Sequence, residues 1–330
     1  MKPLRVLLHH SCLRAKRPTA WLGLTAGLAL CITAKAQPEL RSAEFFRADS
    51  VGLSYRARWA TAPAPRRVRA VAVGIGGGAA AVVGGLGAAW YTGEQVPFRW
   101  FDDSREWVGL DKAGHVWGAF QQSRAAVDRL RWAGLSRGRA LAWGAPVGVV
   151  LQGTIEYFDG RSPGYGASAA DLAANVAGTA LLAGQVALWD KPRVWPKMGV
   201  HLTRFARLRP NTLGATVPER LLKDYNGQTH WLAADVGAFL PAANRWPRWL
   251  GVAVGYGAEG LVYGEPAQNR AAGFRPVRQF YIGPDMHLLN VRTRSKVLRR
   301  LFYVLSIVRL PAPALEVRST GGVRLHGFYF

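Results

Sequence analysis

Three short polar motifs lie at the ends of apolar, helix-like stretches in the middle of the chain. They are Asp-Lys-Ala-Gly-His at 111–115, Gln-Gly-Thr-Ile-Glu-Tyr-Phe-Asp-Gly at 152–160 and Ser-Ala-Ala-Asp-Leu-Ala-Ala-Asn at 168–175. Residues three or four apart share one face of an α-helix, so Asp111 would lie beside His115, and Glu156 beside Asp159. If three helices turned these faces inward, an imidazole, an amine and several carboxylates would meet in one place.

Such a meeting of groups could carry out acid–base chemistry. His115 would act as a general base and Glu156 or Asp159 as the acid, while Lys112 would bind an anionic group. The binding residues would be Asp111, Asp171 and Asn175. On this interpretation the protein is a hydrolase or transferase.

The same residues also have structural explanations. Asp111 suits the positive end of a helix dipole, and Ser168 with Asp171 forms a capping box. Charged groups in an apolar helix are costly, so Glu156 is expected to face inward and to be paired. We therefore interpret the residues as a buried structural network and keep the enzyme as the alternative. Both interpretations predict that at least two of His115, Glu156 and Asp171 lie within about 4–6 Å of each other or of Lys112.

The sequence predicts no metal site and no cofactor. One histidine among carboxylates and an amide lacks the spacing that is typical of zinc sites. The sequence also contains no Gly-x-Ser-x-Gly, no His-Glu-x-x-His, no P-loop and no cysteine pair in such a motif.

The N-terminus has the pattern of an export signal, which we place at residues 1–36. Basic residues at 14–17 precede an apolar stretch at 20–34, and Ala-Lys-Ala at 34–36 fits the small-x-small cleavage rule. Lipidation at Cys31 is the alternative, although Leu30 is larger than the small residue expected before a lipidated cysteine. Cleavage after Ala36 would remove Cys12 and Cys31, which are the two cysteines of the chain.

After the signal, stretches with helical periodicity are followed by stretches with strand-like composition, which predicts an α+β fold. A basic linker (37–67) precedes a membrane-associated bundle of about four helices (68–190), followed by connecting loops (191–227) and a β-containing region (228–330). The predicted helices are 70–90, 108–130, 137–158 and 168–189, and the predicted strands are 249–256, 279–282, 303–310, 315–318 and 323–330. Residues 70–90 are uncharged and long enough to cross a bilayer. Their small residues recur at a spacing of four, which predicts close packing against a neighbouring helix.

The ordered motifs resemble those of a known family. Asp-Lys-x-x-His, Glu-x-x-Asp-Gly and Ser-x-x-Asp-Leu-x-x-Asn-x-x-Gly, in this order, look like the domain of unknown function 2279 family of predicted envelope proteins. The pieces at 223–229 and 255–260 are similar to its longer, Bacteroidetes-type members, so the resemblance covers about 108–330. VanZ-like membrane proteins are a more distant resemblance. Neither implies an established mechanism, and members of the first family are often called lipoproteins.

The predicted function is that of an exported, membrane-associated protein of the cell envelope with a structural or scaffolding role. Its partners would be the lipid bilayer and other envelope proteins. The net charge of +23 does not predict binding to nucleic acid, because the basic residues are dispersed and no nucleic-acid motif accompanies them. Arg66, Arg67 and Arg69 precede the first apolar helix, and the positive-inside tendency leaves the choice between inner and outer membrane open.

Overall fold

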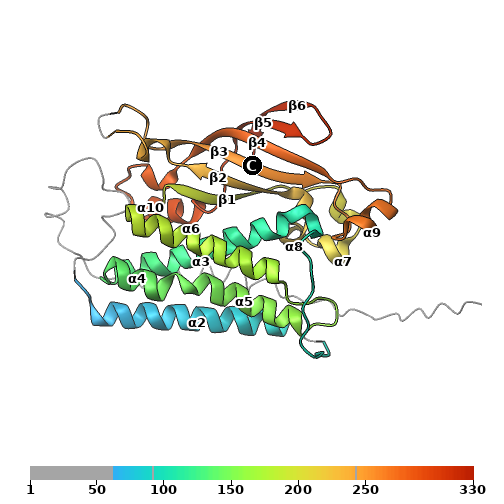
Figure 1. Cartoon of the computed structure of the whole chain (residues 1–330). Helices are drawn as coiled ribbons and strands as arrows, with labels where there is room; N and C mark the ends of the chain where they lie inside the picture. The colour runs from blue at the N-terminus through green and yellow to red at the C-terminus, as the bar shows by residue number, and fades with distance from the viewer. Residues whose placement is uncertain (1–61, 91–92, 242–243) are drawn as a thin grey trace, which may run out of the picture.

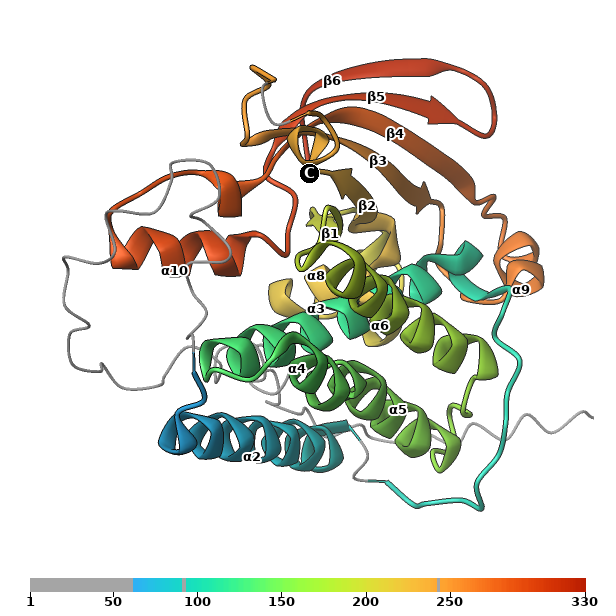
Figure 2. The same cartoon turned by 60° about the vertical axis from the view of Figure 1, so that its left-hand side comes forward.

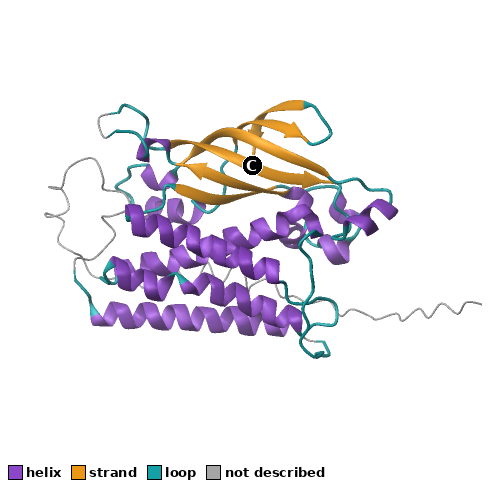
Figure 3. Ribbon diagram, viewed as in Figure 1, coloured by secondary structure: helices purple, strands orange, loops and turns teal. Residues whose placement is uncertain are grey.

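The computed structural model describes residues 62–90, 93–241 and 244–330. The predicted signal peptide and most of the predicted linker lie outside these residues. In the described part, helices dominate the first half of the chain and an antiparallel sheet the second, which confirms the α+β class. Figure 3 shows this separation of helices from strands.

The helices are α2 (Pro65–Trp90), α3 (Leu110–Trp132), α4 (Arg137–Gly144), α5 (Pro146–Gly160), α6 (Ala169–Trp189), α7 (Pro210–Leu213), α8 (Val217–Lys223), α9 (Pro266–Ala271) and α10 (Lys296–Leu305). The strands are β1 (Val194–Val200), β2 (Gln228–Ala234), β3 (Leu250–Glu259), β4 (Val277–Met286), β5 (Ala312–Arg318) and β6 (Val323–Tyr329), and they form one sheet in sequence order. In Figure 1, α3 and α6 lie beside the sheet and α2 lies farthest from it, beyond α4 and α5. Figure 2 shows the same order of layers.

Glycines bring α5 and α6 close to α3. A Cβ atom on Gly178 of α6 would lie 2.2 Å from the carbonyl oxygen of Val116, and one on Gly148 of α5 would lie 2.3 Å from that of Ala119. Neither position can hold a side chain without movement of the backbone. This contact keeps the polar ends of the three helices near one another.

The predicted helix 137–158 is divided in two. Its N-terminus is confirmed, because the Ser136 hydroxyl accepts a hydrogen bond from the backbone N–H of Arg139. Pro146 then begins α5, since a proline has no N–H to continue the ladder of α4 and is tolerated in the first turn of a helix.

The predicted packing of the small residues of α2 is wrong within the described chain. A Cβ atom on Gly74, Gly78 or Gly84 would meet no atom within 4 Å. Instead, the larger side chains of Val71 and Ile75 pack against the core. The small residues of α2 do lie on one face of the helix, but this face points away from the rest of the protein.

Two predictions about the second half of the chain are also corrected. Residues 194–200, within the predicted loops, form β1 at the edge of the sheet, where Pro196 is tolerated because an edge strand need not donate on both sides. The predicted strand 303–310 begins inside α10, whose N-cap Ser295 accepts from the backbone N–H of Leu298. Short apolar stretches of this kind fit a helix as well as a strand.

The two faces of the sheet differ. The face toward the helices contributes Trp231, Ala253 and Tyr281 to the main hydrophobic core. The opposite face exposes apolar side chains, among them Val254 and Ile282. The sheet therefore closes the core on one side only.

Candidate functional site

Four segments of the chain meet near the start of α3. We call their polar side chains the polar cluster: Asp103, Asp111, Lys112, His115, Glu156, Ser168, Asp171 and Asn175. They come from the loop before α3, the first turns of α3, the end of α5 and the start of α6. Ser168 is the N-cap of α6, and its hydroxyl accepts from the backbone N–H of Asp171 at 3.0 Å. The other half of the predicted capping box is wrong, because the backbone N–H of Ser168 donates to Glu156 and not to Asp171.

Lys112 is surrounded by carboxylates. Its Nζ lies 2.7 Å from Asp103, 2.9 Å from Asp111 and 3.2 Å from Asp171. Burial alone would lower the pKa of Lys112, but the neighbouring carboxylates outweigh burial and raise it above its usual value. Lys112 is therefore a permanent cation and not a general base.

His115 is oriented by an amide and faces three acids. Its Nδ1 lies 3.0 Å from Oδ1 of Asn175, and because that oxygen can only accept, Nδ1 carries the proton. Its Nε2 lies 3.6 Å from Glu156 Oε1, 3.8 Å from Asp171 Oδ2 and 3.9 Å from Asp111 Oδ1. The expected approach of His115, Glu156 and Asp171 is confirmed, and the side-chain oxygen of Asn175 has a partner in His115, whereas its buried amide nitrogen has no hydrogen-bond partner among the described residues.

Each of these three carboxylates is held by a donor and also has an oxygen directed toward His115. Oε2 of Glu156 accepts from the backbone N–H of Ser168 at 2.9 Å. Asp111 accepts from the hydroxyl of Tyr225 at 2.9 Å, and Asp171 pairs with Lys112. Burial raises the pKa of Glu156 to about 6 and that of Asp171 to about 7, which makes both more easily protonated than ordinary carboxyls.

Glu156 faces inward and is paired, as expected for a charged residue in an apolar helix. Its contacts are with the backbone N–H of Ser168 and with His115. For Asp159, the structure shows an electrostatic effect, because its charge contributes to the raised pKa of Glu156.

Three neighbours of this site were not predicted from the sequence. Asp103 comes from the charged loop before α3, and Tyr225 belongs to the Lys-Asp-Tyr-Asn-Gly piece that contributed to the family resemblance. His230 of β2 lies against α3, with Cε1 3.8 Å from where a Cβ of Gly114 would be. The quoted motifs contained Tyr225, but no local pattern connects it with Asp111.

Part of the polar cluster could hold a cation. One nitrogen of His115 and one oxygen each of Asp111 and Asp171 all lie within 4.8 Å of one another. An imidazole with carboxylates is a donor set that divalent transition metals accept. The same groups could also move protons.

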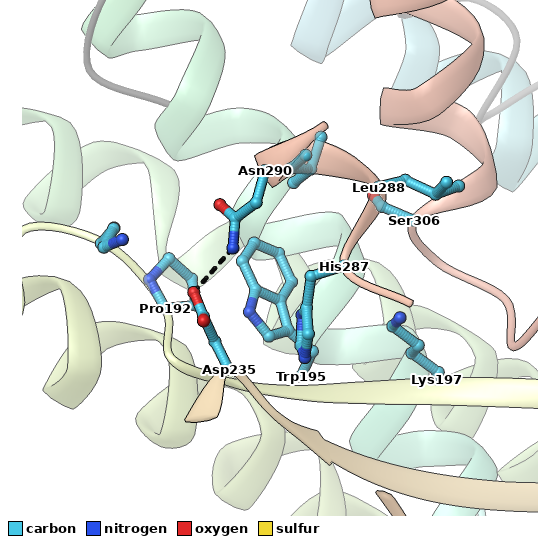
Figure 4. Close-up of a pocket in the computed structure, with 10 residues that line it drawn as sticks. Pro192, Trp195, Lys197, Asp235, His287, Leu288, Asn290 and Ser306 are labelled. Carbon is cyan, nitrogen blue, oxygen red and sulfur yellow. Dashed lines mark hydrogen bonds between the residues drawn. The ribbon is translucent and has the colours of Figure 1, made fainter. Parts of the chain in front are cut away.

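A separate pocket lies between β1, the end of β4 and the C-terminal end of α10 (Figure 4). Its lining includes Trp195, Lys197, Asp235, His287 and Asn290. Lys197 is bonded to Asp285 at 2.5 Å and to the carbonyl of Met286 at 2.9 Å, and Asn290 donates to Asp235 at 2.8 Å. These pairs connect elements of the fold, so we regard the pocket as structural.

Comparison with known proteins gave one finding. Residues 99–185 match the family described as a predicted periplasmic lipoprotein (DUF2279), which confirms the resemblance seen in the motifs for this part of the chain. The matched segment contains every residue of the polar cluster. No curated protein and no solved structure matches. The family description supports an exported protein of the cell envelope and names no activity.

Proposed function

We propose that this protein is a membrane-associated structural protein of the cell envelope, in which the helices contact the lipid bilayer and the polar cluster fastens them to one another. The match to a family of predicted periplasmic lipoproteins supports the envelope location. The membrane contact and the structural role rest on the following observations.

The outer surface of the helices carries the proposal. No residue in the exposed surface of α5 or α6 is charged, and the same holds for α2 after Arg69. Val73, Val150 and Val176 are more than half exposed. Helices in water usually cover their outer face with charged residues, whereas helices in lipid do not.

Helix length is compatible with a bilayer. Within the described residues, α2 and α6 are long and apolar enough to cross a membrane. None of the most apolar window of α2 is buried by the protein, compared with 33% for α6. A core helix of a water-soluble protein would be mostly buried, so α2 is the stronger candidate for direct lipid contact.

The polar cluster supports a structural role. It joins α3, α5, α6 and the loop before α3. Tyr225 connects it to the segment before β2. The side chains of Glu156 and Asp171 are only 5% exposed. Groups this well buried and this densely connected fix the positions of the elements that carry them.

The test is membrane fractionation of the exported protein, followed by alkaline carbonate extraction. We expect the native chain to stay in the membrane fraction until detergent is added. Lysine at a lipid-facing helix position costs about 2.5–3.5 kcal/mol on insertion scales, so Val150→Lys and Val176→Lys should shift protein out of the membrane. Ile282→Lys, at a similarly exposed position of the sheet, is the matched control and should stay.

Two outcomes would contradict membrane contact through the helices. One is a native protein that is soluble without detergent. The other is a pair of helix variants that remain in the membrane as fully as the Ile282→Lys control.

A hydrolase or transferase acting on a lipid-linked or cell-wall substrate is the second candidate. It is favoured by the access that remains to the polar cluster, since the side chains of Asp111, Lys112 and His115 are 16–17% exposed. His115 would be the base, Glu156 or Asp159 the acid, and Lys112 the group that binds an anionic part of the substrate. This candidate requires that removal of the Glu156 carboxylate abolish function in a protein that still folds.

A further inference from the structure

The polar cluster contains more negative charge than its cations balance. Asp103, Asp111, Glu156 and Asp171 surround Lys112, which is the permanent cation among the cluster's residues. With His115 neutral and all four acids ionised, three negative charges have no counterpart within the cluster. Buried carboxylates without a counter-charge are costly, so the arrangement calls for protons or for another cation.

The distances around His115 favour another cation. Nε2 of His115 is 3.6–3.9 Å from one oxygen of each of three acids, which is too long for hydrogen bonds. By contrast, His326 and Glu316 in the same protein bond directly, with Nε2 2.7 Å from Oε2. Ligand atoms around a shared metal are about 3–4 Å apart, because each lies about 2.0–2.4 Å from the ion.

The partners of His115, Glu156 and Asp171 each leave one atom that faces the others, whereas Oδ1 of Asp111, which faces His115, also accepts from the hydroxyl of Tyr225. Nδ1–H of His115 donates to Asn175, so Nε2 has the lone pair that a metal requires. Oε2 of Glu156 is bonded to the backbone of Ser168, while Oε1 faces His115. Oδ1 of Asp171 is the atom near Lys112, while Oδ2 faces His115. Bonds of this kind to the outer atoms of metal ligands hold them in place.

We propose that Nε2 of His115 and one carboxylate oxygen each of Asp111 and Asp171 bind a single divalent transition-metal ion, either Zn²⁺ or Mn²⁺. An imidazole ligand favours these ions over Ca²⁺ and Mg²⁺, which prefer oxygen ligands throughout. The inference adds an ion to the structural role proposed above for the polar cluster. The purpose of that ion rests on the proposed structural role.

The test uses the full exported chain, purified in detergent with a tag that contains no histidine and then stripped with EDTA. Zn²⁺, Mn²⁺, Ca²⁺ and Mg²⁺ are each titrated alone by calorimetry, and bound metal is counted by mass spectrometry. We expect one equivalent of Zn²⁺ or Mn²⁺ per chain and a higher melting temperature on binding. His115→Gln and Asp171→Asn should each weaken binding by about 100-fold or more, since each removes a ligand.

Two variants serve as matched controls. Glu316→Gln changes a buried carboxylate that pairs with His326 and lies outside the polar cluster. His326→Gln removes a histidine that is already bonded to Glu316. Both should keep one equivalent of metal, with affinity within about tenfold of the native protein.

A second measurement covers the case in which the ligand variants fail to fold. Pulsed electron paramagnetic resonance of Mn²⁺ bound to the native chain should show coupling to one imidazole nitrogen. The proposal is overturned if no metal binds at one equivalent, if His115→Gln binds as tightly as the native chain, or if bound Mn²⁺ has no nitrogen ligand. These results do not depend on fractionation, so a soluble protein that binds zinc would contradict only the membrane contact.

Discussion

His230 shows how burial acts on one titratable side chain. Neither of its ring nitrogens has a hydrogen-bond partner, and burial lowers its pKa to about 4, although the charge of Asp111 opposes this. The folded protein therefore holds His230 neutral at a pH where an exposed histidine, with a pKa near 6.5, already takes up a proton. The position of this side chain between β2 and α3 fixes it in that state.

The lowered pKa predicts a pH dependence of stability. Below pH 6.5 the unfolded chain binds a proton at His230 that the folded chain refuses, so stability is present above pH 6.5 and is lost as the pH falls toward about 4. The loss should approach about 3 kcal/mol, at about 1.4 kcal/mol per pKa unit. The measurement is the free energy of unfolding of the native protein and of His230→Gln from pH 8 to pH 4. The difference between the two free energies should become smaller as the pH falls. A difference that is constant with pH would contradict the prediction.

Single residues also show what the sequence could predict of the site. Helical spacing was enough to place His115, Glu156 and Asp171 on inward faces, because that information is local. It could not place Tyr225, whose hydroxyl bonds to Asp111 across 114 residues of chain, or Asp103, which bonds to Ser168 across 65. Such contacts depend on how the layers pack, and no spacing rule encodes them.

At the scale of elements, α2 and α6 contain similar patterns of small residues with different outcomes. Gly178 of α6 lies against the backbone of α3, whereas Gly78 of α2 has no neighbour within 4 Å. A pattern of small residues shows that close approach is possible, and only the fold shows which helix uses it. The same limit explains α10, whose apolar residues fitted a strand as well as a helix.

This difference predicts opposite effects for the same substitution. Gly178→Ala places a methyl group 2.2 Å from a carbonyl oxygen and should lower stability by about 2 kcal/mol or more, because the helices must separate. Gly78→Ala adds a methyl group in open space and should leave stability unchanged or raise it by up to about 1 kcal/mol, since alanine favours helix. Thermal unfolding in detergent measures both. Equal destabilisation by the two variants would show that α2 packs against another chain.

At the scale of the whole molecule, the polar cluster lies where the helices meet the sheet side of the protein. Tyr225 reaches Asp111 from the segment before β2, and Tyr256 of β3 donates to the carbonyl of Val108 at 2.6 Å, just before α3. The layers in Figure 1 are thus connected at the same end of α3 that holds Lys112 and His115. Substitutions in the polar cluster should therefore weaken the packing of the helices against the sheet, and not only the stability of one helix.

Glu156→Gln is the substitution that separates a structural from a catalytic role for this junction. It keeps the size of the side chain and one acceptor for the Ser168 N–H, but it removes the charge. For a structural role, we expect a loss of about 1–2 kcal/mol in the metal-loaded protein, because a charged acceptor is replaced by a neutral one. Complementation of a deletion strain should then decline only as folded protein declines. Glu316→Gln, a buried carboxylate paired with His326, is the matched control and should follow the same relation. A Glu156→Gln protein that melts like the native chain and yet fails to complement would instead establish the acid of an enzyme, since an amide cannot transfer the proton.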